Sequence, residues 1–400
     1  MSNKKKFPDN FLWGVGYSSH QVEGNNSNND WWEWEQKGKT KERSGWACDS
    51  WNRYMIDHKL AQDLGCRAFR LSLEWSRIEP EEGKFSEEAI EHYRKVLRDI
   101  KNRNMKRVVT LWHWTLPLWF SHQYGWHKKD SVKYFTRYCK KVIEELGDEI
   151  DLLITLNEPR LPLNRGYIIG EFPPGKQNPY LFFKARKNMV QAHIECYELV
   201  KKINRNISVG LTQYCNDFNF VGRCKPIKVL TEKIEDFYNW YFFTQIGEAQ
   251  DFMGINYYYG YDYKIDWRYP FFKRVVKNDE MRSNINWEFS PKGIYELTMD
   301  AWRKYKKPIY IFENGAADAK DKIRAQYING HLKYLHKAIK NGADVRGYFH
   351  WSLIDNFEWL EGFWPRFGLC EMNYETMERK PRKSYYFYQR IIKHNSLDAE

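Results

Sequence analysis

The hydrophobic positions of the chain fall into short apolar runs that alternate with amphipathic stretches of helical length. An apolar run of β-branched and aromatic residues without polar alternation is typical of a strand covered on both faces of a sheet. We predict eight such strands, at residues 11–17, 66–73, 107–112, 151–156, 207–211, 252–256, 309–312 and 345–351.

The stretches between these runs carry the signals of helices. Ser86 is a good N-cap for a segment with acidic residues early and basic residues late, and Gly65 and Gly147 follow two other segments as C-caps would. We predict helices at residues 51–64, 86–103, 131–146, 182–203, 228–246, 291–305 and 321–341.

Strict alternation of strand and helix predicts a parallel sheet, and eight is the number of strands that closes a barrel. The alternative, a doubly wound open sheet, would need a topological switch and usually has a glycine-rich nucleotide loop, which this chain lacks. The expected fold is therefore an α/β protein, a (β/α)8 TIM barrel that forms a single domain over residues 1–400.

Polar and aromatic residues gather where the predicted strands end, which in a barrel is the rim that carries function. Such side chains bond hydroxyl groups or stack on apolar ring faces, and sugars present both surfaces. The residues at this rim are Gln21, Arg70, His113, Trp114, Asn157, Glu158, Asn256, Tyr258, Glu313, Trp351, Glu358 and Trp359.

Glu158 and Glu313 each follow a buried strand, where a charged side chain is costly unless it is paired or used. Two carboxyl groups facing one cavity suit the cleavage of a glycosidic bond. Arg70 would hold one glutamate ionised as a nucleophile, whereas Glu158, in a more apolar setting, would keep a raised pKa and act as the acid. These residues alone leave retention and inversion of the anomeric centre both open.

The composition agrees with a globular sugar-binding protein. Aromatic residues make up 18% of the chain, with 18 Trp and 28 Tyr, while 42% of residues are hydrophobic and 29% charged. The formal net charge of +12 raises the question of a polyanionic partner. However, the basic residues are scattered along the sequence, and only residues 4–6 form a run of three. We therefore expect a solvated surface without a nucleic-acid partner.

The cysteines and the N-terminus point to the cytoplasm. The seven cysteines, at positions 48, 66, 139, 196, 215, 224 and 370, include no Cys-x-x-Cys pair, which favours reduced thiols over disulfides or a zinc site. The N-terminal segment lacks the apolar stretch of a signal peptide, and no apolar run approaches transmembrane length. We expect a cytoplasmic protein with no membrane partner, no metal and no cofactor.

Several motifs resemble those of one family, glycoside hydrolase family 1, the retaining β-glycosidases. Residues 155–159 (Thr-Leu-Asn-Glu-Pro) and 311–315 (Ile-Phe-Glu-Asn-Gly) are similar to its acid/base and nucleophile signatures. Further similarities follow in the family's order, at residues 11–14, 21–24, 69–72, 74–78, 111–114, 254–258, 350–353, 355–359 and 366–369.

The resemblance implies that Glu158 is the acid/base and Glu313 the nucleophile, with net retention through a glycosyl-enzyme. It implies that Asn157 bonds the sugar 2-hydroxyl, that Trp351 stacks on the ring, and that Arg70 and Tyr258 orient Glu313. It also implies a supporting role for Asn256 and places the remaining sugar contacts on Gln21, His113, Trp114, Glu358, Trp359 and Phe367.

The implied substrate is a small saccharide or an aryl or alkyl β-glycoside with a terminal neutral sugar. The loop at residues 360–366 lacks the serine, lysine and tyrosine of the family's phospho-glycosidases, and Trp364 would obstruct a phosphate. Glucoside, galactoside, mannoside and fucoside remain open. Two other functions also remain open, a barrel that binds glycans without cleaving them and a transglycosylase of the same family.

Three departures from the family pattern bear on the site. Phe312 replaces a small hydroxyl residue before the nucleophile and is expected either to repack the barrel interior or to disturb Glu313. Arg160 replaces an aromatic platform for the leaving group, which leaves the leaving-group preference open. The region 211–308 is short for the family, which predicts a more open or more mobile mouth of the site.

Overall fold

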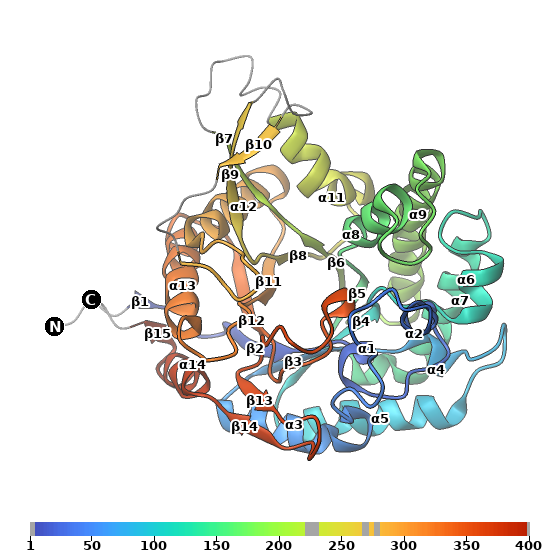
Figure 1. The fold of residues 1–400 in the computed structure, drawn as a ribbon, viewed down its shortest axis with the longest axis horizontal. Coiled ribbons are helices and arrows are strands. Elements are labelled where there is room, and N and C mark those ends of the chain that lie inside the picture. The colour runs from blue at the N-terminus through green and yellow to red at the C-terminus, as the bar shows by residue number, and fades with distance from the viewer. Residues whose placement is uncertain (1–4, 221–231, 266–271, 276–280, 398–400) are drawn as a thin grey trace.

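Eight parallel strands close into a barrel that helices surround (Figure 1). The computed structural model describes residues 5–220, 232–265, 272–275 and 281–397. The barrel order is β2–β3–β4–β5–β6–β8–β11–β12, and β12 pairs with β2 to complete the ring. The predicted (β/α)8 fold is thus confirmed.

The strands of the barrel are β2 (Leu12–Gly16), β3 (Ala68–Ser72), β4 (Lys106–Trp112), β5 (Leu152–Asn157), β6 (Ser208–Tyr214), β8 (Phe252–Asn256), β11 (Ile309–Asn314) and β12 (Val345–Trp351). Three of them run further than predicted, because polar residues that end an apolar run can still continue a strand at the rim. The extensions place Asn157 on β5, Tyr214 on β6 and Glu313 on β11.

The long helices are α3 (Ser50–Leu64), α5 (Glu87–Asn102), α7 (Ser131–Leu146), α9 (Pro179–Ile203), α12 (Pro291–Tyr305), α13 (Arg324–Lys340) and α14 (Lys383–His394). The shorter helices are α1 (Ser19–Val22), α2 (Asp30–Gln36), α4 (Trp75–Ile78), α6 (Leu118–Gln123), α8 (Arg160–Leu163) and α11 (Tyr241–Ile246). Single turns of other helix types are η1 (Gly147–Glu149), η2 (Asn164–Ile169), η3 (Asp236–Trp240) and η4 (Trp359–Glu361).

Two helices keep the predicted end signals, and two others begin three residues away from their predicted starts. The Ser86 hydroxyl accepts a hydrogen bond from the Ala89 amide at 3.2 Å, as an N-cap does, and Gly65 closes α3 with φ of 90°. Helix α9 begins at Pro179 instead of residue 182, because the Asn178 side chain caps it there by accepting a hydrogen bond from the Leu181 amide at 3.1 Å. Helix α13 begins three residues later than predicted, because the Asp318 carboxylate accepts hydrogen bonds from the amides of Ile323 and Arg324. The start of the helix predicted at residues 228–246 lies outside the described residues.

Three small sheets lie outside the barrel. Strands β7 (Asp217–Phe220), β9 (Gly260–Ile265) and β10 (Phe272–Val275) form one that the sequence did not predict, and it projects at the top of Figure 1 beside α11 and α12. Strands β1 (Lys5–Lys6) and β15 (Ser396–Leu397) join the two ends of the described chain. Strands β13 (Cys370–Met372) and β14 (Arg379–Pro381) pair after the barrel closes.

Aromatic rings fill the barrel interior below the rim. The Phe312 ring stacks on Tyr310 with centroids 5.2 Å apart and also contacts Phe252 and Phe349. Gly254 makes room for it, since a Cβ there would lie 2.8 Å from Phe312 Cδ2. Phe312 therefore packs in the interior core, the first of the two outcomes expected for it.

Truncating this ring tests how much the interior layer stabilises the fold. We expect Phe312→Ala to lower the free energy of unfolding by about 3–5 kcal/mol, because a buried ring is lost and a cavity remains. Phe312→Leu, which keeps most of the apolar volume, should cost less than about 1.5 kcal/mol. Guanidinium unfolding followed by tryptophan fluorescence measures both, and an unchanged midpoint for Phe312→Ala would contradict this packing account.

Candidate active site

A cavity of about 450 Å³ opens at the carboxyl ends of the barrel strands. The predicted site residues that line it are Gln21, His113, Trp114, Glu158, Tyr258, Glu313, Trp351, Glu358, Trp359 and Phe367. The other three predicted residues, Arg70, Asn157 and Asn256, lie behind this lining and bond to the two glutamates or to each other. The topology thus brings all of the predicted site residues to one place.

A larger cavity of about 920 Å³ lies between η3, α12 and the small sheet. Its lining is mostly charged and includes none of the predicted site residues. We assign the site to the smaller cavity because both strand-end glutamates and most of the rim aromatics face it.

Glu313 is held at the end of β11 by a cation and a phenol. Its carboxylate forms an ion pair with Arg70, and its second oxygen accepts a hydrogen bond from the Tyr258 hydroxyl at 2.6 Å. Burial and the nearby Glu313 charge raise the pKa of Tyr258 well above its usual value, so this phenol stays a donor. After the strand, Gly315 passes so close to the Trp351 carbonyl that any side chain would collide with it.

Glu158 lies in a different environment, although it faces the same cavity. Its carboxyl accepts a hydrogen bond from Asn256 Nδ2 at 2.8 Å and has no cation within ion-pair distance among the described residues. Burial, followed by the charge of Glu313, raises the pKa of Glu158 to about 8. The two glutamates therefore differ as the sequence analysis expected, one paired with arginine and the other predominantly protonated at neutral pH.

Asn157 joins four strands beneath the cavity. Its side-chain oxygen accepts hydrogen bonds from Arg70 at 2.7 Å, Thr212 at 2.5 Å and Asn256 at 3.2 Å. Its Nδ2 lies 3.0 Å from His113 Nε2. Burial, followed by the charge of Arg70, lowers the pKa of His113 well below its usual value, so the imidazole is neutral and accepts this bond.

Tryptophan and histidine rings build the walls around this polar centre. The His113 ring is nearly parallel to Trp351 at 6.0 Å and to Trp359 at 6.2 Å. Trp359 also contacts Trp114, with ring centroids 4.6 Å apart, and the Trp114 indole donates to the Asn157 carbonyl at 3.2 Å. These rings present apolar faces beside hydrogen-bonding groups, the combination that suits a sugar.

Gln21 and Glu358 form the polar side of the cavity. Gln21 Nε2 donates to the Phe357 carbonyl at 2.8 Å and to Glu358 at 3.4 Å, while its oxygen accepts from Ser18 at 2.7 Å. Burial, followed by the charges of Glu313 and Glu361, raises the pKa of Glu358 to about 8. A carboxyl that is protonated at neutral pH donates as well as accepts, which suits a hydroxyl partner.

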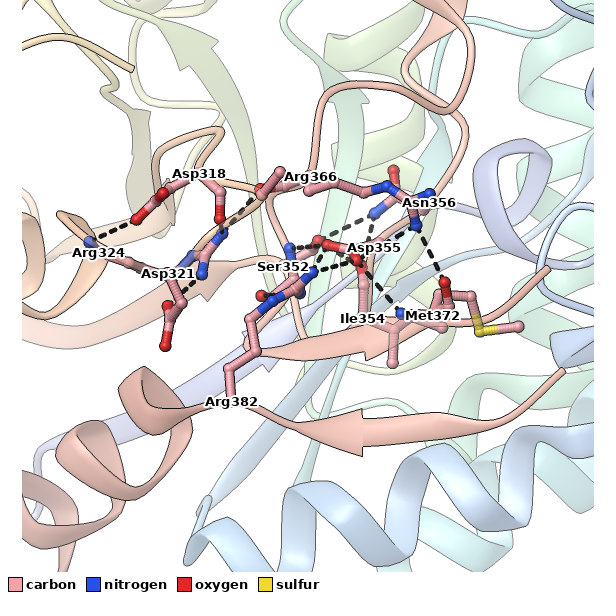
Figure 2. Close-up of polar contacts among 12 residues, drawn as sticks. Asp318, Asp321, Arg324, Ser352, Ile354, Asp355, Asn356, Arg366, Met372 and Arg382 are labelled. Carbon is pink, nitrogen blue, oxygen red and sulfur yellow. Dashed lines mark hydrogen bonds and ion pairs between the residues drawn. The ribbon is translucent and has the colours of Figure 1, made fainter. Parts of the chain in front are cut away.

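Figure 2 shows how the loop after β12, which carries Glu358 and Trp359, is anchored at both ends. At its start, the buried Asp355 carboxylate accepts two hydrogen bonds from Arg382, at 3.0 and 2.8 Å, and one from the Gly368 amide at 2.8 Å. At its end, Arg324 donates to the Arg366 carbonyl at 2.7 Å. The loop is therefore held in position by buried charge-assisted hydrogen bonds before any substrate binds.

Three cavity residues have a left-handed backbone. Glu158, Trp114 and Trp359 have φ of 47°, 78° and 50°, a region that costs a side chain other than glycine roughly 1–3 kcal/mol. Strained backbone of this kind persists only where surrounding contacts enforce it, and it gathers at functional sites. In this cavity the left-handed backbone occurs where a side chain enters the cavity, either directly after a strand or within a tight loop.

Some residues of the cavity were not identified from the sequence. They are Leu161, Arg165, Phe172, Tyr214, Tyr259, Asn284, Ile285 and Trp287, whereas Leu360, Glu361 and Trp364 belong to the loop at residues 360–366 that was expected at the site. The apolar pattern predicts a fifth strand that ends at Leu211, whereas the observed strand continues through polar rim residues to Tyr214. Residues 259–287 carry no motif, although they belong to the region that the sequence analysis considered short.

Arg160 does not face the cavity as an aromatic platform would. Its side chain is buried behind the wall, where Nη2 donates to the Tyr214 carbonyl at 3.0 Å.

Among the described residues no group of three or more His, Cys, Asp or Glu side chains is arranged to hold a metal ion.

The fold and the cavity together define a class, a (β/α)8 barrel with two carboxyl groups and aromatic walls at its carboxyl-end rim. A model of glycosyl hydrolase family 1 matches residues 3–246 and 242–397. The chain therefore belongs to glycosyl hydrolase family 1 and is a glycoside hydrolase.

The relatives span the whole chain. Beta-glucosidase A of Thermotoga maritima is 30% identical over 444 positions, which cover 99% of this chain and 100% of that protein. A beta-galactosidase of Pyrococcus woesei is 30% identical, with 98% of each covered. The solved beta-glycosidase from Pyrococcus horikoshii is 39% identical with a TM-score of 0.92, over 99% of this chain and 96% of that one.

The described part of the chain contains no helix that is both long enough and apolar enough to cross a membrane.

Proposed function

We propose that this glycoside hydrolase is a retaining exo-β-glycosidase that removes terminal β-linked neutral sugars by double displacement. The observation that carries the proposal is the contrast between two glutamates on one cavity, Glu313 paired with Arg70 and Glu158 held neutral by burial. An ionised carboxylate supplies a nucleophile, and a protonated carboxyl supplies an acid.

In the first step, Glu158 donates its proton to the leaving oxygen while Glu313 attacks the anomeric carbon. Arg70 and Tyr258 orient the attacking carboxylate, since each binds one of its two oxygens. Asn157 is held by Arg70, Thr212 and His113, and in this proposal its second amide N–H bonds the sugar 2-hydroxyl, where contacts tighten in the transition state. The product of this step is a glycosyl ester of Glu313.

In the second step, Glu158 acts as a base. Esterification removes the negative charge of Glu313, and that charge is one of the causes of the raised pKa of Glu158. Glu158 then ionises more readily and takes a proton from the incoming water as the ester bond breaks. The order of the two steps is thus favoured by the charge change at Glu313 itself.

The cavity supports a neutral terminal sugar as the substrate. Glu358 and Glu361 lie on the loop on which, by the family resemblance, phospho-glycosidases carry their phosphate-binding residues. Trp364 fills part of the same wall, with its indole donating to Glu361 at 3.1 Å. Carboxyl groups and an indole disfavour a phosphate. The relatives include beta-glucosidases, such as that of Thermotoga maritima, and beta-galactosidases, such as that of Pyrococcus woesei, which supports glucosides and galactosides as the first substrates to assay.

The stereochemistry of hydrolysis tests the proposal. We expect proton NMR of an aryl β-glucoside during turnover to show the β-anomer of the free sugar first, because two displacements restore the starting configuration. The α-anomer should appear only later, as mutarotation proceeds. If the α-anomer formed first, the retaining mechanism would be wrong.

The raised pKa of Glu158 predicts the pH dependence of activity. The acid must be protonated in the first step, so kcat/KM should be constant below the pKa of Glu158 and fall as pH rises through about 8. Steady-state kinetics with 4-nitrophenyl β-glucoside across this range measures the alkaline limb.

A matched variant shows which group produces that limb. In Glu158→Gln, a substrate with a strongly acidic leaving group, such as a dinitrophenyl β-glucoside, needs no proton donor. With this substrate, the pH profile of kcat/KM for Glu158→Gln should lose the alkaline limb near pH 8. A limb that stays in place in this variant would assign it to another carboxyl, such as Glu358.

A further inference from the structure

Arg160 is a buried cation without a carboxylate partner. It begins α8, and only 8% of its surface is exposed. Its guanidinium donates to the Tyr214 carbonyl at 3.0 Å and lies 5.7 and 5.1 Å from the ring centroids of Tyr214 and Tyr238. Its Nε has no hydrogen-bond acceptor within the described residues.

The other buried arginines of the described chain are different, because each has a carboxylate partner. These pairs are Arg70 with Glu313, Arg107 with Asp151, Arg324 with Asp321, Arg379 with Asp57 and Arg382 with Asp355. Burying a charge without a partner destabilises the fold, and ring faces compensate only in part. The position of Arg160 therefore calls for a functional explanation.

The negative group that this cation influences is Glu158, two residues earlier in the chain. Two carbonyls of β6 hold the segment in place: Thr212 accepts from the Glu158 amide at 2.8 Å, and Tyr214 accepts from Arg160. The Arg160 charge lowers the pKa of Glu158 and so opposes the effects of burial and Glu313.

Several elements around Glu158 contribute charged or titratable groups that face it. Arg70 of β3 is a cation, Glu313 of β11 is its anionic neighbour, and Asn256 of β8 donates a hydrogen bond. Tyr214, Cys215 and Tyr258 also interact with its charge, but burial raises the pKa of each, so all three are neutral at physiological pH. Arg70 and Arg160 are thus the two cations among the largest influences on the charge of Glu158.

We propose that Arg160 is a positioning residue for the second half of the reaction, in which its buried charge stabilises the ionised form of Glu158. This inference rests on the proposed double displacement. In the first step the charge of Glu313 keeps the proton on Glu158 despite Arg160.

After Glu313 is esterified, the two cations act on Glu158 without that opposing anion. Water then attacks the anomeric carbon, its proton passes to the Glu158 carboxylate, and the bond from the anomeric carbon to Glu313 breaks to regenerate that carboxylate. Arg160 favours the ionised base that this step requires, and it does so without contacting the sugar.

Removing the charge should shift the pH dependence of the second step. The good leaving group of 2,4-dinitrophenyl β-glucoside should make deglycosylation limiting. With this substrate we expect the acid limb of kcat for Arg160→Met to move up by about one pH unit. Below that limb, kcat should be about tenfold lower than in the wild type. The alkaline limb of kcat/KM for 4-nitrophenyl β-glucoside should move upward as well. A pre-steady-state burst confirms which step is limiting.

Three further variants separate charge from packing. Arg160→Lys keeps a cation and should retain both limbs near the wild-type positions. Arg160→Gln keeps an amide donor for the Tyr214 carbonyl but removes the charge, so it should show the shift expected for Arg160→Met. It replaces the methionine variant in the test if that variant does not fold.

Arg186→Met is the matched control. The Arg186 guanidinium lies 3.9 Å from the Tyr241 ring centroid, is not part of the lining of the cavity, and pairs with no described carboxylate. The pH profiles of kcat and kcat/KM for Arg186→Met should be the same as those of the wild type.

Two results would overturn the inference. One is a pH profile with unchanged limbs in both uncharged Arg160 variants, and the other is a loss of kcat by the same factor at every pH, which is the signature of a packing role. Either result leaves double displacement intact as long as the wild type releases the β-anomer first. An α-anomer from the wild type would instead refute the proposed function.

Discussion

The ion pair between Arg70 and Glu313 is the interaction on which the site depends. Both side chains are almost completely buried, and two such charges are tolerated only when each is paired and hydrogen-bonded. Arg70 also donates to Asn157 at 2.7 Å and to the Phe312 carbonyl at 3.3 Å, while Tyr258 binds the other oxygen of Glu313. The barrel supplies these partners from β3, β5, β11 and the segment after β8, so the position of Glu313 and its contacts depend on the closure of the fold.

Burial and, after it, the charge of Glu313 set the pKa of the other carboxyl groups of the cavity. Glu158 and Glu358 are both buried near Glu313, and the pKa of each rises to about 8. One paired carboxylate beside two protonated carboxyls is an arrangement that suits acid and nucleophilic chemistry on a neutral sugar. In the proposed mechanism, Arg160 adds a second cation behind Glu158, and its charge favours the Glu158 carboxylate once Glu313 is esterified. In this account the reaction is controlled by the charges around Glu158, and the aromatic walls provide the binding surface.

Periodicity and strand-end chemistry predicted much of this arrangement, because in a parallel barrel the strand order determines which residues share the rim. Gln21 and Glu358 are more than 300 residues apart in the chain, yet both could be assigned to one cavity. Contacts that depend on three-dimensional packing could not be predicted. Tyr214 lies on a strand whose polar end resembled a loop, Trp287 has no motif, and the direction of the Arg160 side chain follows from its contacts with Tyr214 and Tyr238. The place of Phe312 depends on the space at Gly254, on another strand.

The most direct test of the central claim is chemical rescue of Glu313→Gly with azide. Glycine removes the nucleophile and leaves space on the face of the sugar from which Glu313 would attack, where a small anion can bind in its place. The account predicts that this variant has lost turnover of an aryl β-glucoside, and that added azide restores release of the aryl group and yields the α-glycosyl azide, identified by NMR. Ordinary hydrolytic activity of Glu313→Gly without azide, or a β-glycosyl azide as the rescued product, would contradict the assignment of Glu313.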